Sequence, residues 1–324
     1  MNHPNTEKNI TPFNPSGISR RQFLKYAFYL TATGIVCPFL PDLGWTDTDD
    51  LLTKIIPRTN ERIPVIGMGT WQTFHVGKDE TLRNARTEVL RTFFDMGGTV
   101  IDSSPMYGTS EEVIGYALGR LDHKKSLFSA TKIWTPFKAQ GLYQLRGSHS
   151  LWGLNRFDLV QIHNLVAWQD HLELLLEWKK QGLVRYIGIT TSHGRLHEQF
   201  EKVMTSAPID FVQFTYNVLD REAEQRLLPI AAERKLGVII NRPFQGGQLF
   251  PLFAKHPLPE WAGEFGARTW SQFFLKFIVS HPAVTCTIPA TSRIDHMKEN
   301  MAALAGRLPT EPERKKMAEY ITQL

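Results

Sequence analysis

The chain has 324 residues, of which 42% are hydrophobic and 21% are charged. This is the composition of a folded soluble protein, and the length suits one large α/β domain or two ordinary ones. The net charge is only +5, which is too small to predict a nucleic-acid-binding surface. The two cysteines, Cys37 and Cys286, form neither a disulfide framework nor a zinc-ligand pattern, so we expect no metal site.

The N-terminal region resembles a bacterial twin-arginine export signal. A polar stretch precedes the run SRRQFLK (residues 19–25), and a weakly apolar segment, residues 26–36, follows it. That segment is shorter than the roughly 20 apolar residues that a membrane-spanning helix needs. The resemblance implies that residues 1–44 are a leader for the twin-arginine (Tat) translocase, which exports folded proteins, and that the protein is periplasmic or otherwise exported. No clear cleavage motif follows, so the leader is either removed or kept as a membrane tether.

Strand-like and helix-like segments alternate from residue 45 to residue 324. Segments with helical periodicity, such as residues 79–97 and 168–182, separate short apolar runs that are rich in β-branched residues. Such runs are typical of strands buried on both faces of a parallel sheet. The expected strands are residues 62–70, 98–104, 127–132, 158–163, 185–190, 210–216, 236–244 and 284–290. They predict an α/β fold, a single (β/α)8 TIM barrel over residues 45–324.

A doubly wound sheet is the alternative fold. It should carry a Gly-x-Gly-x-x-Gly turn after its first strand, and GMGTWQ (residues 67–72) does not complete that pattern. A β-hairpin in KIIPRTNERIPVIG, turning at Thr59 and Asn60, is expected to close the bottom of the barrel, and a C-terminal helix with a solvated charged face is expected in ERKKMAEYITQL. The Pro- and aromatic-rich segment 250–266 either folds over the site or packs on the barrel rim.

Four polar residues are expected in one sector of the barrel mouth. Asp102, Lys132 and His163 end the second, third and fourth strands, and Tyr107 begins the loop after the second. An ammonium beside Tyr107 would lower the phenol pKa from near 10, and a carboxylate would keep that ammonium charged. A neutral His163 would hydrogen-bond a substrate carbonyl oxygen. None of these side chains can supply a hydride, so the reductant would be a cofactor.

Each of these four residues has an ordinary structural explanation when it is taken alone, as a turn, surface or packing residue. Together, the motifs IDSSPMYGTSEEVIG, SATK and VQIHN resemble the aldo/keto reductase family from about residue 51 to the C-terminus. The resemblance implies a (β/α)8 barrel that binds a nicotinamide dinucleotide and reduces aldehydes or ketones, with Tyr107 as general acid. An exported cofactor-binding redox sensor or interaction module on the same barrel is the alternative, because an exported protein has no obvious supply of NADPH.

The resemblance also implies a set of cofactor contacts. Two threonines, Thr190 and Thr191, replace the family's common Ser-Asn pair, and Asn241 replaces an aromatic residue that often stacks on the nicotinamide. The segment 291–293 suits a ribose 2′-phosphate, which favours NADP(H) and leaves NAD(H) as the alternative. The residues expected to contact the cofactor are Thr70, Trp71, Thr190, Thr191, Gln213, Arg242, Phe244, Thr291, Ser292, Arg293, Glu299 and Asn300.

The substrate is expected to be a small carbonyl compound, which the sequence does not identify further. We expect the protein to act as a monomer without nucleic-acid partners. The walls of its substrate site are expected to be largely aromatic. The residues predicted to form them are Trp71, Phe74, His75, Trp134 and Trp168.

Overall fold

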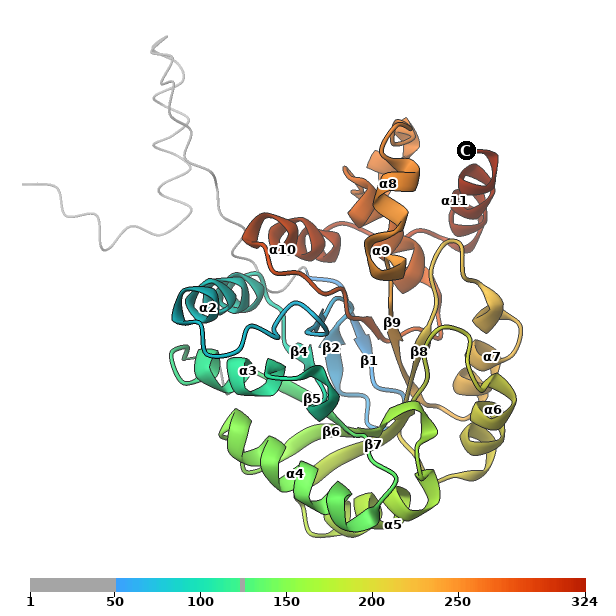
Figure 1. The fold of residues 1–324 in the computed structure, drawn as a ribbon. Coiled ribbons are helices and arrows are strands. Elements are labelled where there is room, and N and C mark those ends of the chain that lie inside the picture. The colour runs from blue at the N-terminus through green and yellow to red at the C-terminus, as the bar shows by residue number, and fades with distance from the viewer. Residues whose placement is uncertain (1–50, 123–125) are drawn as a thin grey trace, which may run out of the picture. The chain divides into compact units, whose positions relative to one another are not determined.

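The computed structural model of the protein describes residues 51–122 and 126–324. The leader predicted for residues 1–44, which includes Cys37, lies outside these ranges. Within them, one parallel sheet has the strand order β10-β9-β8-β7-β6-β5-β4-β3, and helices surround it (Figure 1). Its strands are β3 (Met68–Gly69), β4 (Val100–Asp102), β5 (Phe128–Ile133), β6 (Phe157–Ile162), β7 (Val184–Thr190), β8 (Phe211–Thr215), β9 (Gly237–Asn241) and β10 (Cys286–Thr287).

Backbone bridges between the two outermost strand segments close this sheet into a barrel. Ile66 bridges to Thr287 and Gly69 bridges to Ala290, and both bridges are parallel. Glycine is needed at residue 69, because a Cβ atom there would lie 2.8 Å from the Ile288 carbonyl oxygen. The closed parallel sheet confirms the predicted (β/α)8 barrel and excludes the doubly wound alternative, whose sheet is open.

A β-hairpin packs against the amino-terminal ends of the barrel strands, as predicted. β1 (Thr53–Ile55) pairs antiparallel with β2 (Arg62–Pro64), and Asn60 in the turn has φ +60°. Ile63 of β2 joins an apolar cluster that contains Phe128, near the start of β5. The prediction of one strand over residues 62–70 was wrong in its extent. The segment divides because β2 pairs with β1 in the hairpin, whereas β3 pairs with β4 in the barrel.

The helices follow the strands along the chain. They are α2 (Glu80–Asp95), α3 (Ser110–Leu118), α4 (Lys138–Trp152), α5 (Trp168–Lys180), α6 (His197–Ser206), α7 (Leu227–Glu233), α8 (Leu249–Phe253), α9 (Trp270–Ser280), α10 (Ile294–Met301) and α11 (Glu311–Gln323). The last of these confirms the predicted C-terminal helix, and α9 is buried along nearly its whole length. Across residues 51–122 and 126–324, none of the helices combines the length and the apolar character that crossing a bilayer requires.

The aromatic segment between β9 and α9 packs on neighbouring helices. The Phe253 ring of α8 lies 5.3 Å from the Trp270 ring of α9, measured between centroids. The Trp261 ring lies 5.9 Å from the Tyr320 ring of α11, and the Tyr320 hydroxyl donates to the Pro257 carbonyl oxygen at 3.1 Å. Of the two alternatives for residues 250–266, these contacts favour packing on the rim of the barrel.

Candidate active site

Two charged residues at the carboxyl ends of neighbouring strands form a buried ion pair. Lys132 Nζ of β5 donates to Asp102 Oδ2 of β4, and also to the Ser103 carbonyl oxygen at 2.9 Å. The side chains of Lys132 and Asp102 are 0% and 2% exposed. Burial by itself lowers the pKa of Lys132, but its partners, above all the Asp102 carboxylate, outweigh burial and raise that pKa. The ammonium is therefore charged at neutral pH.

The second oxygen of Asp102 is held by two amide groups. Gln161 Nε2 of β6 donates to Asp102 Oδ1 at 3.1 Å, and Gln213 Nε2 of β8 donates to the same oxygen at 3.0 Å. Both glutamines are buried, so these bonds stabilise the carboxylate where little water reaches it. Gln213, which the resemblance assigns to the cofactor, thus has a role in holding Asp102.

Tyr107 lies on a short 3₁₀ turn, η3 (Pro105–Tyr107), directly after β4. Lys132 Nζ is 5.2 Å from the centroid of its ring. The sequence led us to expect that this ammonium lowers the pKa of Tyr107. Lys132 does lower that pKa, but burial and the Asp102 charge together raise it by more, so the expected net lowering was wrong. Tyr107 is a neutral phenol at neutral pH and is able to donate a proton.

His163 follows the last residue of β6 and begins the 3₁₀ turn η4 (His163–Leu165). Its ring stands edge-on to the Tyr107 ring, with 5.8 Å between centroids and 83° between the planes. Nδ1 of His163 lies 3.1 Å from Ser104 Oγ. Burial and the Lys132 charge lower the pKa of His163 to about 3, so the imidazole is neutral. The structure therefore brings the four predicted polar residues together in one cluster, in which Asp102, Lys132 and His163 are buried and Tyr107 is half-buried.

The threonines predicted to border the cofactor are buried and hydrogen-bonded to the ends of neighbouring strands. Thr70 Oγ1 donates to the Asp102 carbonyl oxygen at 3.0 Å, whereas the adjacent Trp71 is 40% exposed. Thr190 Oγ1 accepts from the Asn164 backbone amide at 3.1 Å. The Thr191 carbonyl oxygen accepts from Asn241 Nδ2 at 2.9 Å, and its hydroxyl donates to the Arg195 carbonyl oxygen. These hydroxyls support the mouth of the barrel.

Two further predicted cofactor residues follow β9 and differ in their surroundings. Arg242 has φ +50° and forms no ion pair within the described part of the chain. Burial and the nearby Arg195 lower its pKa, although Asp220 opposes this. Phe244 is buried and packs on Phe250 with 4.9 Å between ring centroids. At this end of the barrel, the guanidinium of Arg242 is a cation that suits an anionic ligand.

The predicted adenosine-binding segment forms the start of α10. Thr291 Oγ1 accepts from the Arg293 backbone amide at 3.1 Å, and Ser292 is half-buried. The exposed Arg293 guanidinium forms two hydrogen bonds with the Asp295 carboxylate, at 3.0 and 2.5 Å. Glu299 is half-buried, whereas Asn300 is buried and its Oδ1 accepts from Ser271 Oγ at 2.7 Å. Asn300 therefore ties α10 to α9.

The five residues predicted to line the substrate site differ in exposure: His75 is exposed, and Trp168 is half-buried and packs against the main apolar core. Trp71 and Trp134 are 40% and 44% exposed, and they lie within two residues of Thr70 and Lys132 respectively. Phe74 is completely buried in the main apolar core, so the expectation that it contacts substrate was wrong. Its burial depends on packing between segments far apart in sequence, which a local pattern does not reveal.

The structure adds polar residues that the sequence analysis did not assign. Glu111 of α3 is 2% exposed and accepts hydrogen bonds from Thr131 Oγ1 at 2.6 Å, Ser148 Oγ at 2.9 Å and Trp152 Nε1 at 3.1 Å. It therefore holds together the elements behind Lys132, while burial raises its pKa. Gln161 and Ser104 were likewise missed, although both lie inside the quoted motifs. Their side-chain partners come from other strands, and the motifs alone do not show them.

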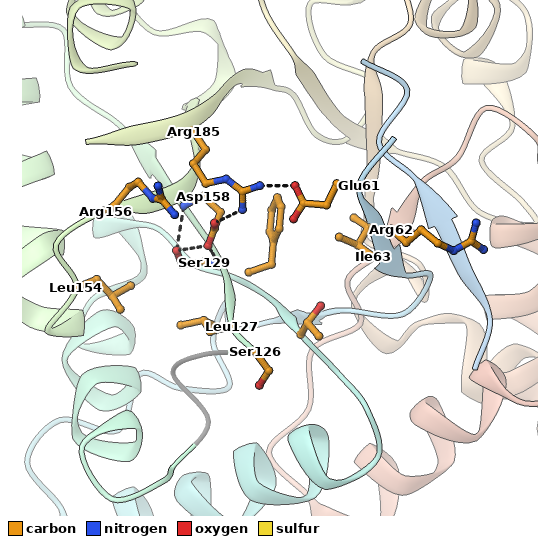
Figure 2. Close-up of a pocket in the computed structure, with 12 residues that line it drawn as sticks. Glu61, Arg62, Ile63, Ser126, Leu127, Ser129, Leu154, Arg156, Asp158 and Arg185 are labelled. Atoms are coloured by element: carbon orange, nitrogen blue, oxygen red, sulfur yellow. Dashed lines mark hydrogen bonds and ion pairs between the residues drawn. The ribbon is translucent and has the colours of Figure 1, made fainter. Parts of the chain in front are cut away.

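A separate cavity of about 380 Å³ lies at the opposite end of the barrel, beside the first residues of β5 and β6 (Figure 2). There Arg185 donates to Asp158 Oδ1 at 2.7 Å and also contacts Glu61 Oε2. None of the four clustered polar residues lines this cavity. In the ranges that the structure describes, no group of three or more His, Cys, Asp or Glu residues is placed to hold a metal ion.

The amino-acid sequence of this chain is similar to that of known proteins. The model of the aldo/keto reductase family matches residues 65–315. The chain is 29% identical over 193 residues to aldo-keto reductase YhdN of Bacillus subtilis (strain 168), a match that covers 54% of this chain and 56% of YhdN. It is 25% identical over 251 residues to methylglyoxal reductase YeaE of Escherichia coli (strain K12), covering 76% of this chain and 87% of YeaE.

Solved structures show the same fold. An aldo/keto reductase from Klebsiella pneumoniae, solved in complex with NADP and acetate, has a TM-score of 0.69 and 24% identity to this chain. That likeness covers 82% of this chain and 94% of the Klebsiella protein. The family match extends over well more than half of the sequence and includes all four clustered residues. The chain therefore belongs to the aldo/keto reductase family and is an oxidoreductase built on a (β/α)8 barrel.

Proposed function

We propose that this protein reduces the carbonyl group of small aldehydes or ketones, with NADP(H) as cofactor and Tyr107 as the general acid. One observation carries the proposal: at the carboxyl ends of β4, β5 and β6, the Lys132 ammonium, paired with Asp102, lies 5.2 Å from the Tyr107 ring centroid, and the Tyr107 and His163 rings lie 5.8 Å apart. The pKa directions agree with this geometry, because they leave a neutral phenol, a charged ammonium and a neutral imidazole. The names of the relatives and the NADP in the Klebsiella structure support the same reaction.

The residues at the barrel mouth fit a dinucleotide that carries phosphates. Arg242 offers a guanidinium without an ion-pair partner in the described chain, and Thr291 and Arg293 stand at the start of α10. The exposed pair between Arg293 and Asp295 contributes little to stability, so a ribose 2′-phosphate is able to replace the carboxylate. When bound, NADPH supplies the hydride that no side chain provides. NAD(H) is the alternative cofactor. Comparing the affinities of the protein for NADPH and for NADH distinguishes the two.

The four clustered residues then have distinct tasks. His163 hydrogen-bonds and orients the substrate carbonyl oxygen. Tyr107 Oη gives its proton to that oxygen as negative charge develops on it, and the product is the alcohol. Lys132 stabilises the phenolate that this transfer leaves, because its ammonium lies 5.2 Å from the ring centroid. Asp102 holds the ammonium in place.

Tyr107→Phe tests this assignment, because it removes the hydroxyl and keeps the ring. Steady-state reduction of a carbonyl panel, followed by NADPH absorbance, should fall on the order of 10³-fold. NADPH affinity, measured by fluorescence titration, should stay within about twofold, since the phenol acts on the substrate oxygen. Methylglyoxal is the first substrate to try, given the activity in the name of YeaE.

Tyr143→Phe is the matched control, because Tyr143 lies on α4 and is 79% exposed. It should leave turnover unchanged. Full turnover in Tyr107→Phe would remove the proposed mechanism. Tight NADPH binding by the wild-type protein without multiple turnover on any carbonyl compound would instead favour a cofactor-binding sensor.

We also propose that residues 1–44 direct export through the twin-arginine translocase. The support is the SRRQFLK run with its short apolar extension. Replacing Arg20 and Arg21 by Lys should retain the full-length chain inside the cell, whereas Lys8→Gln should not affect export. Cell fractionation with mass spectrometry of the exported chain measures both the location and any cleavage. Unchanged export of the double-Lys variant would contradict the assignment.

A further inference from the structure

Ser104 connects the two residues that are expected to face the carbonyl oxygen. It is completely buried and stands between Asp102 and the turn that carries Tyr107. Its Oγ accepts a hydrogen bond from the Met106 backbone amide at 3.2 Å, and its carbonyl oxygen accepts one from the Tyr107 amide at 2.9 Å. The same Oγ lies 3.1 Å from His163 Nδ1. One side chain therefore caps the Tyr107 turn and contacts the imidazole.

The hydrogen atoms in this small network have one consistent arrangement. A serine hydroxyl has one proton and two acceptor lone pairs, and the Met106 amide occupies one lone pair. Within the described part of the chain, the remaining partner of Ser104 Oγ is His163 Nδ1. If Nδ1 carried a proton and donated it, the serine proton would have no acceptor in a buried site, which is costly. Ser104 therefore donates, and Nδ1 accepts.

We propose that Ser104 is a positioning residue that fixes the tautomer of His163, so that the imidazole carries its proton on Nε2. This inference rests on the proposed carbonyl reduction. His163 Nε2 has no hydrogen-bond partner in the described part of the chain and is not completely buried. It is therefore accessible from the barrel mouth. The neutral state of His163, which burial and Lys132 impose through its low pKa, leaves a single ring proton to be placed.

This arrangement suits a carbonyl oxygen, which has two lone pairs and accepts hydrogen bonds. His163 Nε2–H occupies one lone pair, and the Tyr107 hydroxyl donates to the other. With the proton on Nδ1 instead, Nε2 would present a lone pair to the oxygen and repel it. Ser104 thus links the orientation of the general acid, through its cap, to the donor state of the imidazole.

Nuclear magnetic resonance on the ¹⁵N-histidine-labelled protein tests the inference without any turnover. Long-range ¹H–¹⁵N correlations at pH 7 show which ring nitrogen bears the proton, and loss of one spin system in His163→Gln assigns the residue. We expect Nε2 to be protonated in the wild-type protein. Protonation at Nδ1 would overturn the proposal, even if Tyr107→Phe shows that carbonyl reduction is correct.

Variants then connect the tautomer to catalysis. Ser104→Ala should give mixed tautomers and lower kcat/KM about tenfold, the effect of one hydrogen bond of about 1.4 kcal/mol. Ser104→Thr keeps the hydroxyl and should restore the Nε2–H tautomer. Ser110→Ala is the matched control, because its buried hydroxyl donates to the Tyr107 carbonyl oxygen at 2.8 Å and does not contact His163.

The control should leave the tautomer unchanged, whatever it does to the turn. An unaltered His163 tautomer in Ser104→Ala would overturn the inference. If Ser104→Ala fails to fold, the wild-type spectrum still shows whether His163 carries its proton on Nε2, and a proton on Nδ1 would overturn the inference. If the wild-type protein reduces no carbonyl compound but His163 carries its proton on Nε2, the proposed function fails while the role of Ser104 in the imidazole network stands.

Discussion

The two ends of the barrel both contain cations paired with carboxylates, but in different surroundings. At the carboxyl end, the side chains of Lys132 and Asp102 are 0% and 2% exposed. At the amino end, Arg185 pairs with Asp158 and Glu61 (Figure 2). The side chains of Arg185, Asp158 and Glu61 are 30%, 13% and 32% exposed. Water therefore screens the second set far more than the first.

This difference distinguishes the proposed reactive site from a structural ion-pair cluster. The buried Lys132 ammonium acts strongly on its neighbours: it counteracts the burial effect on the pKa of Tyr107 and lowers the pKa of His163. The Arg185 charge is shared by two carboxylates, and water reaches all three groups. Perturbed titratable groups gathered around one desolvated charge are typical of functional sites.

Lys132→Met should produce the largest effect. Asp102 would lose its cation and keep only its two amide donors, so the free energy of unfolding should fall by about 3–5 kcal/mol. Reduction should fall on the order of 10³-fold, because the phenolate loses its stabilising charge. Chemical denaturation and NADPH-coupled assays measure both quantities. The double variant Lys132→Met/Asp102→Asn should recover stability but not activity, and recovered activity would exclude the charge from the mechanism.

The pH dependence should differ between the two directions of reaction. Burial keeps the pKa of Tyr107 above its usual range despite Lys132, so the phenol stays protonated and carbonyl reduction should be constant between about pH 6 and 8. Alcohol oxidation needs the phenolate and should rise about tenfold per pH unit below that pKa. A reduction rate that declines steadily across this range would show a more acidic phenol than the structure indicates.

His163 should make the protein less stable in acid. Its pKa is about 3 when folded and about 6.5 when unfolded, so between these values the unfolded chain binds a proton that the folded chain does not. Stability from this group is complete above about pH 6.5 and declines by up to about 1.4 kcal/mol per pH unit as pH falls toward 3. The free energy of unfolding of His163→Gln, measured with urea at several pH values, should therefore decline less steeply as the pH falls. Some decline should remain in this variant, because burial also lowers the pKa of His281, to about 4.

Arg185→Met should have the smallest effect. Removing a partly screened cation from Asp158 and Glu61 should lower the free energy of unfolding by about 1 kcal/mol, and less at high salt. The value of kcat/KM should stay at the wild-type level, because Arg185 lies at the opposite end of the barrel from Tyr107. A loss of activity comparable to that of Lys132→Met would remove the distinction between the two ends.

Local sequence patterns carried much of the information about this protein. The strand runs predicted the barrel because a strand buried on both faces must be apolar along its whole length. Asp102, Lys132 and His163 were identifiable because each follows such a run and parallel strands converge at one mouth. The cofactor residues came from resemblance alone. Several of them, such as Thr70 and Asn300, make structural hydrogen bonds that no local pattern indicates.

The sequence by itself determined the order of the elements, the strand ends at which the polar residues stand and the family to which the chain belongs. Tertiary structure alone decided that Gln161 and Gln213 hold Asp102, that Ser104 meets His163, and that Tyr107 stays protonated. The reason is physical. Periodicity follows from the backbone of each segment, whereas a pKa or a hydrogen bond across strands depends on how closely distant segments pack and how completely they exclude water.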